Sequence, residues 1–140
     1  MVHNDSVTIV PLDEKGKIWF VTQFRMGSEE ILLELPAGIL EDGETPENCA
    51  SREIREEIGM AAGKLHKLGA IYLAPGYSNE LNHVYLATDL SPSPLEADED
   101  EFLGIEKYPY ISINSMVASG EIIDSKSVAA LSLTSIFLNK

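Results

Sequence analysis

Three glutamates stand close together within residues 53 to 57, in a segment with the composition of a helix. Glu53 and Glu57 are four residues apart, so on a helix their side chains share a face, and Glu56 lies at its edge. Carboxylate oxygens held on a rigid element suit Mg²⁺ or Mn²⁺, whereas zinc sites more often contain His or Cys. These residues predict either a site for a hard divalent cation or a solvated face on which Arg52 pairs with Glu56.

The helix that carries these glutamates has clear boundaries in the sequence. Thr45 suits the N-cap, Pro46 the first helical position, and Gly59 the position just past the end. Between these ends, apolar residues recur at four-residue spacing and predict a buried stripe, formed by Ala50, Ile54 and Ile58. Because the glutamates flank this stripe, we expect them near the body of the domain, which favours the cation site over the solvated face.

The rest of the chain reads as strands with interspersed helices. Residues 7–10 and 18–24 predict a hairpin around turn residues 13–16, and the prolines and charges of residues 91–101 predict an exposed loop. We expect further strands over 31–35, 67–73, 82–88 and 105–111, a short helix over 113–118 and a longer one over 125–138. Strands and helices do not alternate strictly, so the sequence predicts one α/β (α+β) domain over residues 1–140, with a mixed sheet flanked by helices.

The composition excludes two classes of partner. The 140 residues include 10 Lys and Arg against 23 Asp and Glu, a formal net charge of −13, and residues 38–60 and 96–101 hold −10 of it. Such a surface repels nucleic-acid backbones and anionic lipids, so we expect neither nucleic acid nor membrane as a partner, although divalent cations would allow an anionic substrate. The single Cys49 cannot form an internal disulfide, and residues 1–10 lack a secretion signal, so we expect a cytoplasmic protein.

Residues 38–60 resemble in full the signature of the Nudix hydrolases. That signature is a glycine, five residues, Glu, seven residues, and then Arg-Glu-apolar-x-Glu-Glu-x-Gly-apolar. Its constrained positions are here Gly38, Glu44, Arg52, Glu53, Ile54, Glu56, Glu57, Gly59 and Met60. At ordinary residue frequencies, a chance match at one starting point is less frequent than about 10⁻⁸.

This resemblance implies an α/β/α sandwich and a role for each matching residue. Glu53 and Glu57 would be the principal ligands of Mg²⁺ (or Mn²⁺), and Glu57 would thereby also be catalytic. Glu56 would be a further or water-mediated ligand, and the backbone carbonyl of Ala37 an additional one. Arg52 would orient the glutamates, with Gly38 and Glu44 in supporting roles. In the family, the metals neutralise phosphate oxygens and activate the water that displaces a phosphoryl group.

Segments outside the signature resemble the ADP-ribose pyrophosphatase branch of the family. These are LELPAG before it, APGYSNE after it, the exposed loop of residues 91–101 (the acidic loop), and GEIIDSKSVAAL near the end. The resemblance implies a nucleoside diphosphate linked to another group as substrate, such as ADP-ribose, which would give AMP and a sugar phosphate. Arg25 and Glu34 match positions that line the substrate cleft, and Glu80 matches one that reaches the neighbouring subunit's substrate in dimeric relatives, which suggests a homodimer.

Alternatives to this substrate and function stay open at this point. Relatives in this branch usually carry a further N-terminal segment that helps to build the dimer and the adenosine pocket, and this sequence begins almost without it. Either another element supplies specificity, or the substrate differs from ADP-ribose. Nucleoside triphosphates and dinucleoside polyphosphates are the alternative substrates. A noncatalytic nucleotide-sensing module is the alternative from another class, and the intact set of glutamates argues against it.

The acidic loop yields a prediction about the catalytic base. In the branch that this chain resembles, a glutamate on this loop positions or deprotonates the attacking water, and Glu99 is the first match, with Glu101 second. Glu99→Gln should lower kcat by orders of magnitude with little change in KM, since a general base acts on the chemical step more than on binding. Steady-state kinetics would check this, and an unchanged kcat would exclude Glu99.

Overall fold

Two β-sheets form the centre of the protein. The computed structural model describes residues 5–95 and 104–139. One sheet is four-stranded, in the order β4-β1-β6-β5, and the other is three-stranded, in the order β3-β2-β7. The strands are β1 (Ser6–Pro11), β2 (Lys17–Arg25), β3 (Glu30–Glu34), β4 (Ala37–Ile39), β5 (Met60–Tyr72), β6 (Leu81–Pro92) and β7 (Gly104–Pro109). Because β1 runs parallel to β6 and antiparallel to β4, the larger sheet is mixed, as predicted.

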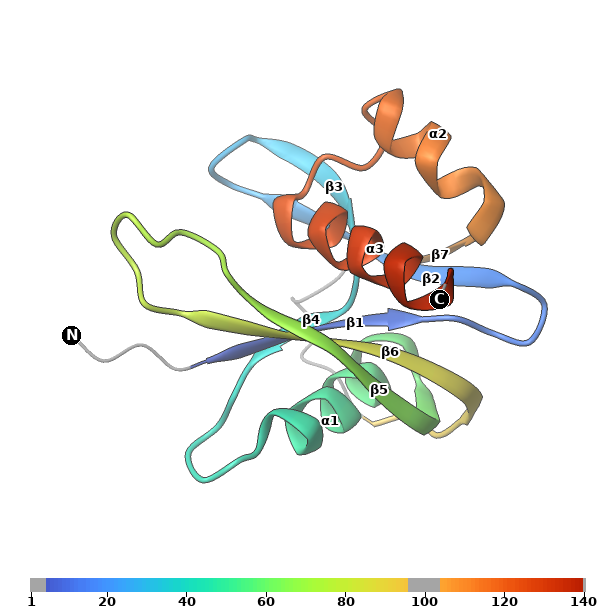
Figure 1. Cartoon of the computed structure of the whole chain (residues 1–140), viewed down its shortest axis with the longest axis horizontal. Helices are drawn as coiled ribbons and strands as arrows, with labels where there is room; N and C mark the ends of the chain where they lie inside the picture. Colours follow the sequence, from blue (N-terminus) through green and yellow to red (C-terminus); the bar gives the residue numbers. More distant parts are fainter. Residues whose placement is uncertain (1–4, 96–103, 140) are drawn as a thin grey trace.

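Two helices enclose the four-stranded sheet. Helix α1 (Pro46–Ile58) and helix α3 (Ser125–Leu138) lie on opposite sides of it, and the short α2 (Ile113–Ala118) follows a 3₁₀ turn, η1 (Tyr110–Ser112) (Figure 1). The side chains of β1 alternate between the two layers: Val7 and Ile9 pack in the core beneath α1, and Val10 packs in the core beneath α3. This arrangement confirms the α/β/α sandwich. Among the described helices, none combines the length and hydrophobicity that a membrane-spanning helix needs.

The hairpin expected for residues 7–10 and 18–24 is wrong, because β1 and β2 belong to different sheets. The turn itself is present: the Asp13 carboxylate accepts from the backbone N–H groups of Lys15 and Lys17. Just beyond the end of β1, an isolated bridge pairs Leu12 with Ile18 of β2. The strands then separate, since β4 and β6 already occupy both edges of β1.

Two other strands are longer than the sequence predicts. Strand β5 begins at Met60, directly after α1, rather than at residue 67, and β6 continues to Pro92, into the segment expected to be a loop. Strand β5 lies at the edge of its sheet and has no fully buried residue, so its sequence lacks the alternation that marks a half-buried strand. The two helices expected over 113–118 and 125–138 are confirmed with those bounds.

The ends of α1 are those expected from its sequence. The hydroxyl of Thr45 accepts a hydrogen bond from the backbone N–H of Asn48, 3.1 Å away, and Pro46 occupies the first turn. Gly59 has φ of 70°, a left-handed conformation that favours glycine, and its N–H donates to the carbonyl of Arg55. These caps fix where the helix begins and ends, and therefore which of its residues face the sheet.

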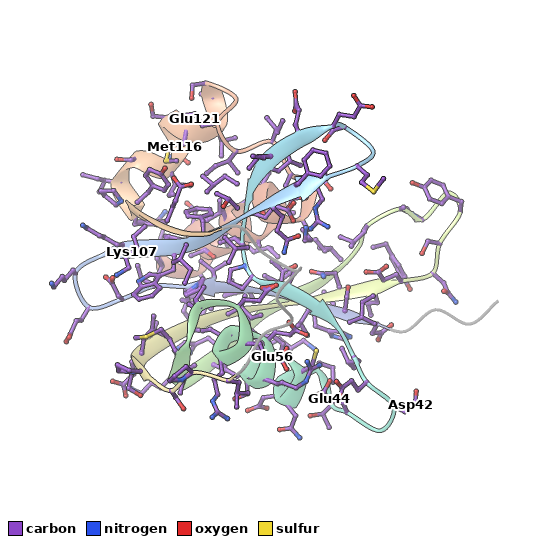
Figure 2. All side chains as sticks on the ribbon, turned by 180° about the vertical axis from the view of Figure 1, so that it is seen from behind. Asp42, Glu44, Glu56, Lys107, Met116 and Glu121 are labelled. Carbon is purple, nitrogen blue, oxygen red and sulfur yellow. The ribbon has the colours of Figure 1, made fainter. Side chains whose placement is uncertain are left out.

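One ion pair ties the loop before α1 to the helix. Arg52 donates from Nε and Nη2 to the two carboxylate oxygens of Glu44, at 2.8 and 2.9 Å. Glu44 comes from the loop, whereas Glu56 lies on the helix itself (Figure 2). The hydrogen bonds from Arg52 lower the pKa of Glu44 to about 2, from an ordinary value of 4.5. The pair therefore stabilises the fold only while Glu44 is ionised.

This shift in pKa predicts how Glu44 affects stability at low pH. A carboxyl whose folded pKa is depressed contributes stability above its unfolded pKa, near 4.5, and loses that contribution as the pH falls toward 2. Glu44→Gln should therefore lower the free energy of unfolding at pH 7 and differ less from the original protein at pH 3. Urea unfolding at both values would measure this, with the exposed Glu47→Gln as control. An equal difference at both pH values would contradict the assignment.

Candidate active site

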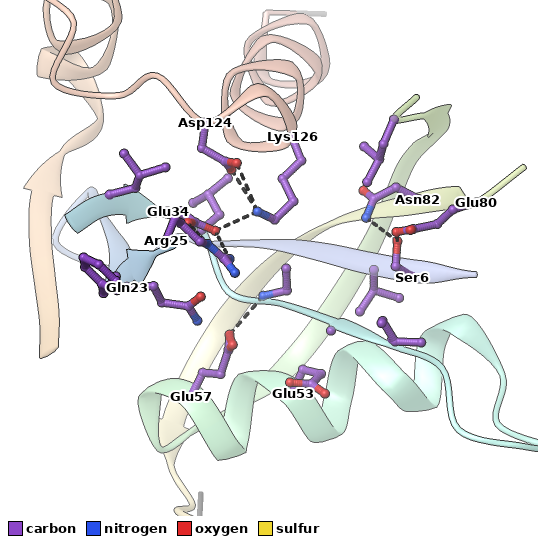
Figure 3. Close-up of a pocket in the computed structure, with 18 residues that line it drawn as sticks. Ser6, Gln23, Arg25, Glu34, Glu53, Glu57, Glu80, Asn82, Asp124 and Lys126 are labelled. Atoms are coloured by element: carbon purple, nitrogen blue, oxygen red, sulfur yellow. Dashed lines mark hydrogen bonds and ion pairs between the residues drawn. The ribbon is translucent and has the colours of Figure 1, made fainter. Parts of the chain in front are cut away.

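A cleft of about 830 Å³ lies where the two sheets, α1 and the start of α3 meet (Figure 3). Its walls combine apolar side chains with five carboxylates and two cations among the described residues that line it. The cleft brings together most of the residues predicted from the sequence: Arg25, Glu34, Ala37, Gly38, Glu53, Glu57 and Glu80. Glu44, Arg52 and Glu56 lie behind this lining, and Glu99 and Glu101 fall outside the described residues.

Glu53 and Glu57 form the acidic wall of the cleft. They are 8% and 5% exposed and extend from the same face of α1 toward the cleft, as their spacing predicts. The backbone N–H of Ala37 donates to Glu57 Oε2 at 2.9 Å, which joins β4 to the helix. Gly38 lies so close to Glu53 that an added Cβ would be 2.1 Å from its Cδ. Only glycine leaves room for this carboxylate.

Arg52 connects Glu53, which lines the cleft, with Glu44 and Glu56, which do not. Its Nη1 donates to Glu53 Oε1 at 2.9 Å and to Glu56 Oε2 at 3.2 Å. Its other nitrogens hold Glu44, and these hydrogen bonds are the main reason that the pKa of Arg52 is raised. The guanidinium therefore orients Glu53 from behind, and Glu56 faces Arg52 rather than the cleft.

A buried carboxylate with two cations forms the opposite wall. The side chain of Glu34 is 1% exposed and accepts from Arg25 at both oxygens, with Nε–Oε2 of 2.6 Å and Nη2–Oε1 of 2.5 Å. Lys126 Nζ lies 2.7 Å from the same Oε1. Burial alone would raise the pKa of Glu34, but the hydrogen bonds from both cations outweigh it and lower the pKa. Glu34 is thus an ionised anchor for two positive charges at the cleft.

A third group of polar residues lies at the other end of the cleft. Ser6 Oγ donates to Glu80 Oε2 at 2.6 Å, and Asn82 Nδ2 donates to Ser6 Oγ at 2.9 Å. Among the described residues, none donates a hydrogen bond to the buried Oδ1 of Asn82. The remaining capacity of this group is mainly for accepting hydrogen bonds, which suits hydroxyl or amino groups rather than phosphate. Glu80 thus lines the same cleft as Glu53 and Glu57.

The oxygen atoms on the acidic wall are ligands that suit a hard divalent cation. The described lining contains carboxylate and backbone oxygens but neither His nor Cys. Among the described residues, no three His, Cys, Asp or Glu side chains gather closely enough to enclose a metal by themselves. A divalent cation at the acidic wall would therefore have Glu53 and Glu57 as its carboxylate ligands among the described residues.

Five polar residues of the described lining were not identified from the sequence: Ser6, Gln23, Asn82, Asp124 and Lys126. A signal for two of them was present, because Asp124 directly precedes the terminal helix as its N-cap and places Lys126 in the first turn. Ser6 and Asn82 lie in strands whose sequences indicate only that the strands exist. Their proximity depends on the parallel pairing of β1 with β6, in which the two residues are register partners.

Comparison with known proteins agrees with this geometry. Residues 2–131 match the NUDIX domain family. An ADP-ribose pyrophosphatase of Bacillus subtilis (strain 168) is 40% identical over 131 residues, which cover 92% of this chain and 71% of the relative. A methanol dehydrogenase activator of Bacillus methanolicus is 34% identical over 131 residues, with the same two shares covered.

A solved structure extends the similarity to the fold. The crystal structure of an ADP compounds hydrolase matches with a TM-score of 0.92 and 28% sequence identity, over 99% of this chain and 74% of that one. The match confirms the fold class expected from the sequence. The chain therefore belongs to the NUDIX domain family and is a Nudix pyrophosphohydrolase, as residues 38–60 predict.

Proposed function

We propose that this enzyme hydrolyses the diphosphate bond of a nucleoside diphosphate linked to a sugar, with ADP-ribose as the first candidate and AMP and ribose 5-phosphate as its products. The observation that carries the proposal is the pairing of an acidic wall, Glu53 and Glu57, with a cationic wall anchored by Glu34 across one cleft. The names of two similar proteins, an ADP-ribose pyrophosphatase and an ADP compounds hydrolase, support an ADP-containing substrate. A homodimer and a cytoplasmic location stay predictions from the sequence.

Glu53, Glu57 and the backbone carbonyl of Ala37 would hold Mg²⁺ in this proposal. When bound, the metal would neutralise phosphate oxygens and lower the pKa of an attacking water. The chain supplies the positions of these ligands: the N–H of Ala37 holds Glu57, Gly38 leaves space for Glu53, and Arg52 orients Glu53 from behind. The role of Glu56 as a water-mediated ligand stays a prediction from the sequence.

Arg25 would bind the substrate diphosphate from the opposite wall. Its side chain is 45% exposed, and a guanidinium can contact two phosphate oxygens at once. Glu34, expected to contact substrate, would act mainly through Arg25. Its carboxylate is buried and both of its oxygens already accept from cations, so we assign it the role of fixing the guanidinium at the cleft.

Glu80 would contact the part of the substrate that carries hydroxyl groups. Its carboxylate accepts from Ser6 at one oxygen and retains capacity for further donors. Phosphate would be repelled at this acidic end of the cleft, whereas sugar hydroxyls would be accepted. This division of the cleft supports a diphosphate that is joined to a sugar over a free terminal phosphate.

A panel of substrates tests the proposed reaction. The purified protein with Mg²⁺ should convert ADP-ribose to AMP and ribose 5-phosphate, which chromatography of the products would detect. Nucleoside triphosphates, dinucleoside polyphosphates and other nucleotide sugars complete the panel. Faster turnover of triphosphates or dinucleoside polyphosphates would replace the proposed substrate, and no turnover of any compound would favour a nucleotide-sensing module.

Substitution of Glu57 tests the acidic wall. Glu57→Gln should lower kcat by about two orders of magnitude or more, because the amide removes a negative charge from the proposed metal ligands. The amide can still accept the hydrogen bond from Ala37, so the fold should remain stable. Glu47→Gln, on an exposed position of the same helix, serves as the control. Full Mg²⁺-dependent activity of Glu57→Gln would refute the assignment.

A further inference from the structure

Lys126 is a second cation at the cleft, and it is not among the site residues predicted from the sequence. It lies in the first turn of α3 and lines the cleft beside Arg25 (Figure 3). Its ammonium group contacts Glu34 Oε1 at 2.7 Å and the two carboxylate oxygens of Asp124 at 3.1 and 3.0 Å. Its three N–H donors therefore face three carboxylate oxygens.

The position of Lys126 is fixed by contacts that do not involve its own charge. Asp124 caps α3 by accepting from the N–H and hydroxyl of Ser127. The hydroxyl of Ser127 in turn accepts from the backbone N–H of Leu35, next to Glu34. The first turn of α3 is thereby attached to the end of β3, and this attachment sets Lys126 opposite the buried carboxylate of Glu34.

The ammonium group of Lys126 could serve to neutralise Glu34 or to bind an anion in the cleft, and the surrounding charges distinguish these two roles. Glu34 already accepts a two-point ion pair from Arg25, so one cation suffices to neutralise it. Lys126 is a further positive charge, and Asp124 balances it. Its side chain is 16% exposed and reaches the cleft, so it is available to an anion that enters there.

We propose that Lys126 is a direct ligand of the substrate diphosphate. Its ammonium group is paired with the carboxylate of Asp124 until the phosphate replaces that carboxylate. This inference rests on the proposed function, because it assigns the diphosphate to the cationic wall. Arg25 and Lys126 contact the same oxygen of Glu34, so their charges lie close enough together to bind neighbouring phosphate oxygens. Asp124 is then an internal competitor of the substrate, and Glu34 holds both cations in place throughout.

Two substitutions with opposite expected effects test the proposal. Binding of ADP is measured by calorimetry in EDTA, so that no divalent metal contributes. Lys126→Gln should weaken ADP binding by about tenfold, the usual effect of losing a charge-assisted hydrogen bond, and should reduce its dependence on salt. Asp124→Asn should strengthen ADP binding, because it removes the competing charge. Asn is also a good N-cap, so α3 should keep its start.

The controls separate a ligand from a residue that only stabilises the fold. Lys64→Gln, at an exposed position of β5, removes the same charge without touching the cleft and should bind ADP as the original protein does. If Lys126 only neutralises Glu34, Lys126→Gln and Asp124→Asn should both lower the temperature of unfolding, and neither should strengthen ADP binding. That result would overturn the proposal. So would equal ADP affinity of Lys126→Gln and Lys64→Gln, or an original protein that does not bind ADP in EDTA.

The same data separate this proposal from the proposed function. ADP binding that depends on Lys126, in a protein that hydrolyses no compound of the substrate panel, would support the cationic ligand and refute the hydrolytic reaction. Hydrolysis of ADP-ribose with kcat and KM unchanged in Lys126→Gln would support the reaction and refute the ligand. An increase in KM with little change in kcat is the result expected for a group that binds the diphosphate before and during the reaction.

Discussion

The burial of negative charge is the constraint on which the rest of the site depends. Glu34, Glu53 and Glu57 are almost completely buried, and a buried carboxylate is costly unless donors or cations surround it. Each has such a neighbour: Arg25 at Glu34, Arg52 at Glu53, and the N–H of Ala37 at Glu57. Because these neighbours come from β2, α1 and β4, satisfying the carboxylates also fixes the elements relative to one another.

The cleft has one acidic and one cationic wall because a helix lies on each side of the four-stranded sheet. Helix α1 presents carboxylates from one side of the four-stranded sheet, and the first turn of α3 presents Lys126 from the other. The short strand β4 lies at the edge of this sheet, paired with β1 through Thr8 and Ala37. Its Ala37 and Gly38 are the backbone against which α1 packs. A diphosphate held in this cleft would therefore meet oxygen ligands on one side and cations on the other.

Local signals predicted α1 and its carboxylate face, because caps, a stripe of apolar residues and the spacing of Glu53 and Glu57 are all properties of one segment. The same holds for α3, whose bounds were predicted correctly. What depends on pairing between distant segments was not predictable in this way. The strands β1 and β2 were expected to pair since they are neighbours in sequence, yet β6, some seventy residues away, occupies that edge of β1. Ser6 and Asn82 reach the cleft through such a pairing, and Lys126 reaches it through the hydrogen bond that joins Ser127 of α3 to the backbone of Leu35.

The net negative charge of the cleft must be compensated before an anion can bind there, and each wall does this differently. Its described lining holds five carboxylates and two cations, so an anionic substrate is repelled unless some of this charge is compensated. Cations bound at Glu53 and Glu57 would compensate the acidic wall. On the opposite wall, Arg25 is paired with Glu34 but its side chain is 45% exposed, whereas the 16% exposed Lys126 becomes available only if one of its carboxylate partners, Glu34 or Asp124, yields to the substrate. Glu34 is buried with both oxygens engaged, whereas Asp124 lies at a helix start where a capping residue needs only one oxygen. The carboxylate that would give up its cation under our proposal is therefore Asp124, and the cost of releasing Lys126 would set how tightly this wall could hold a diphosphate.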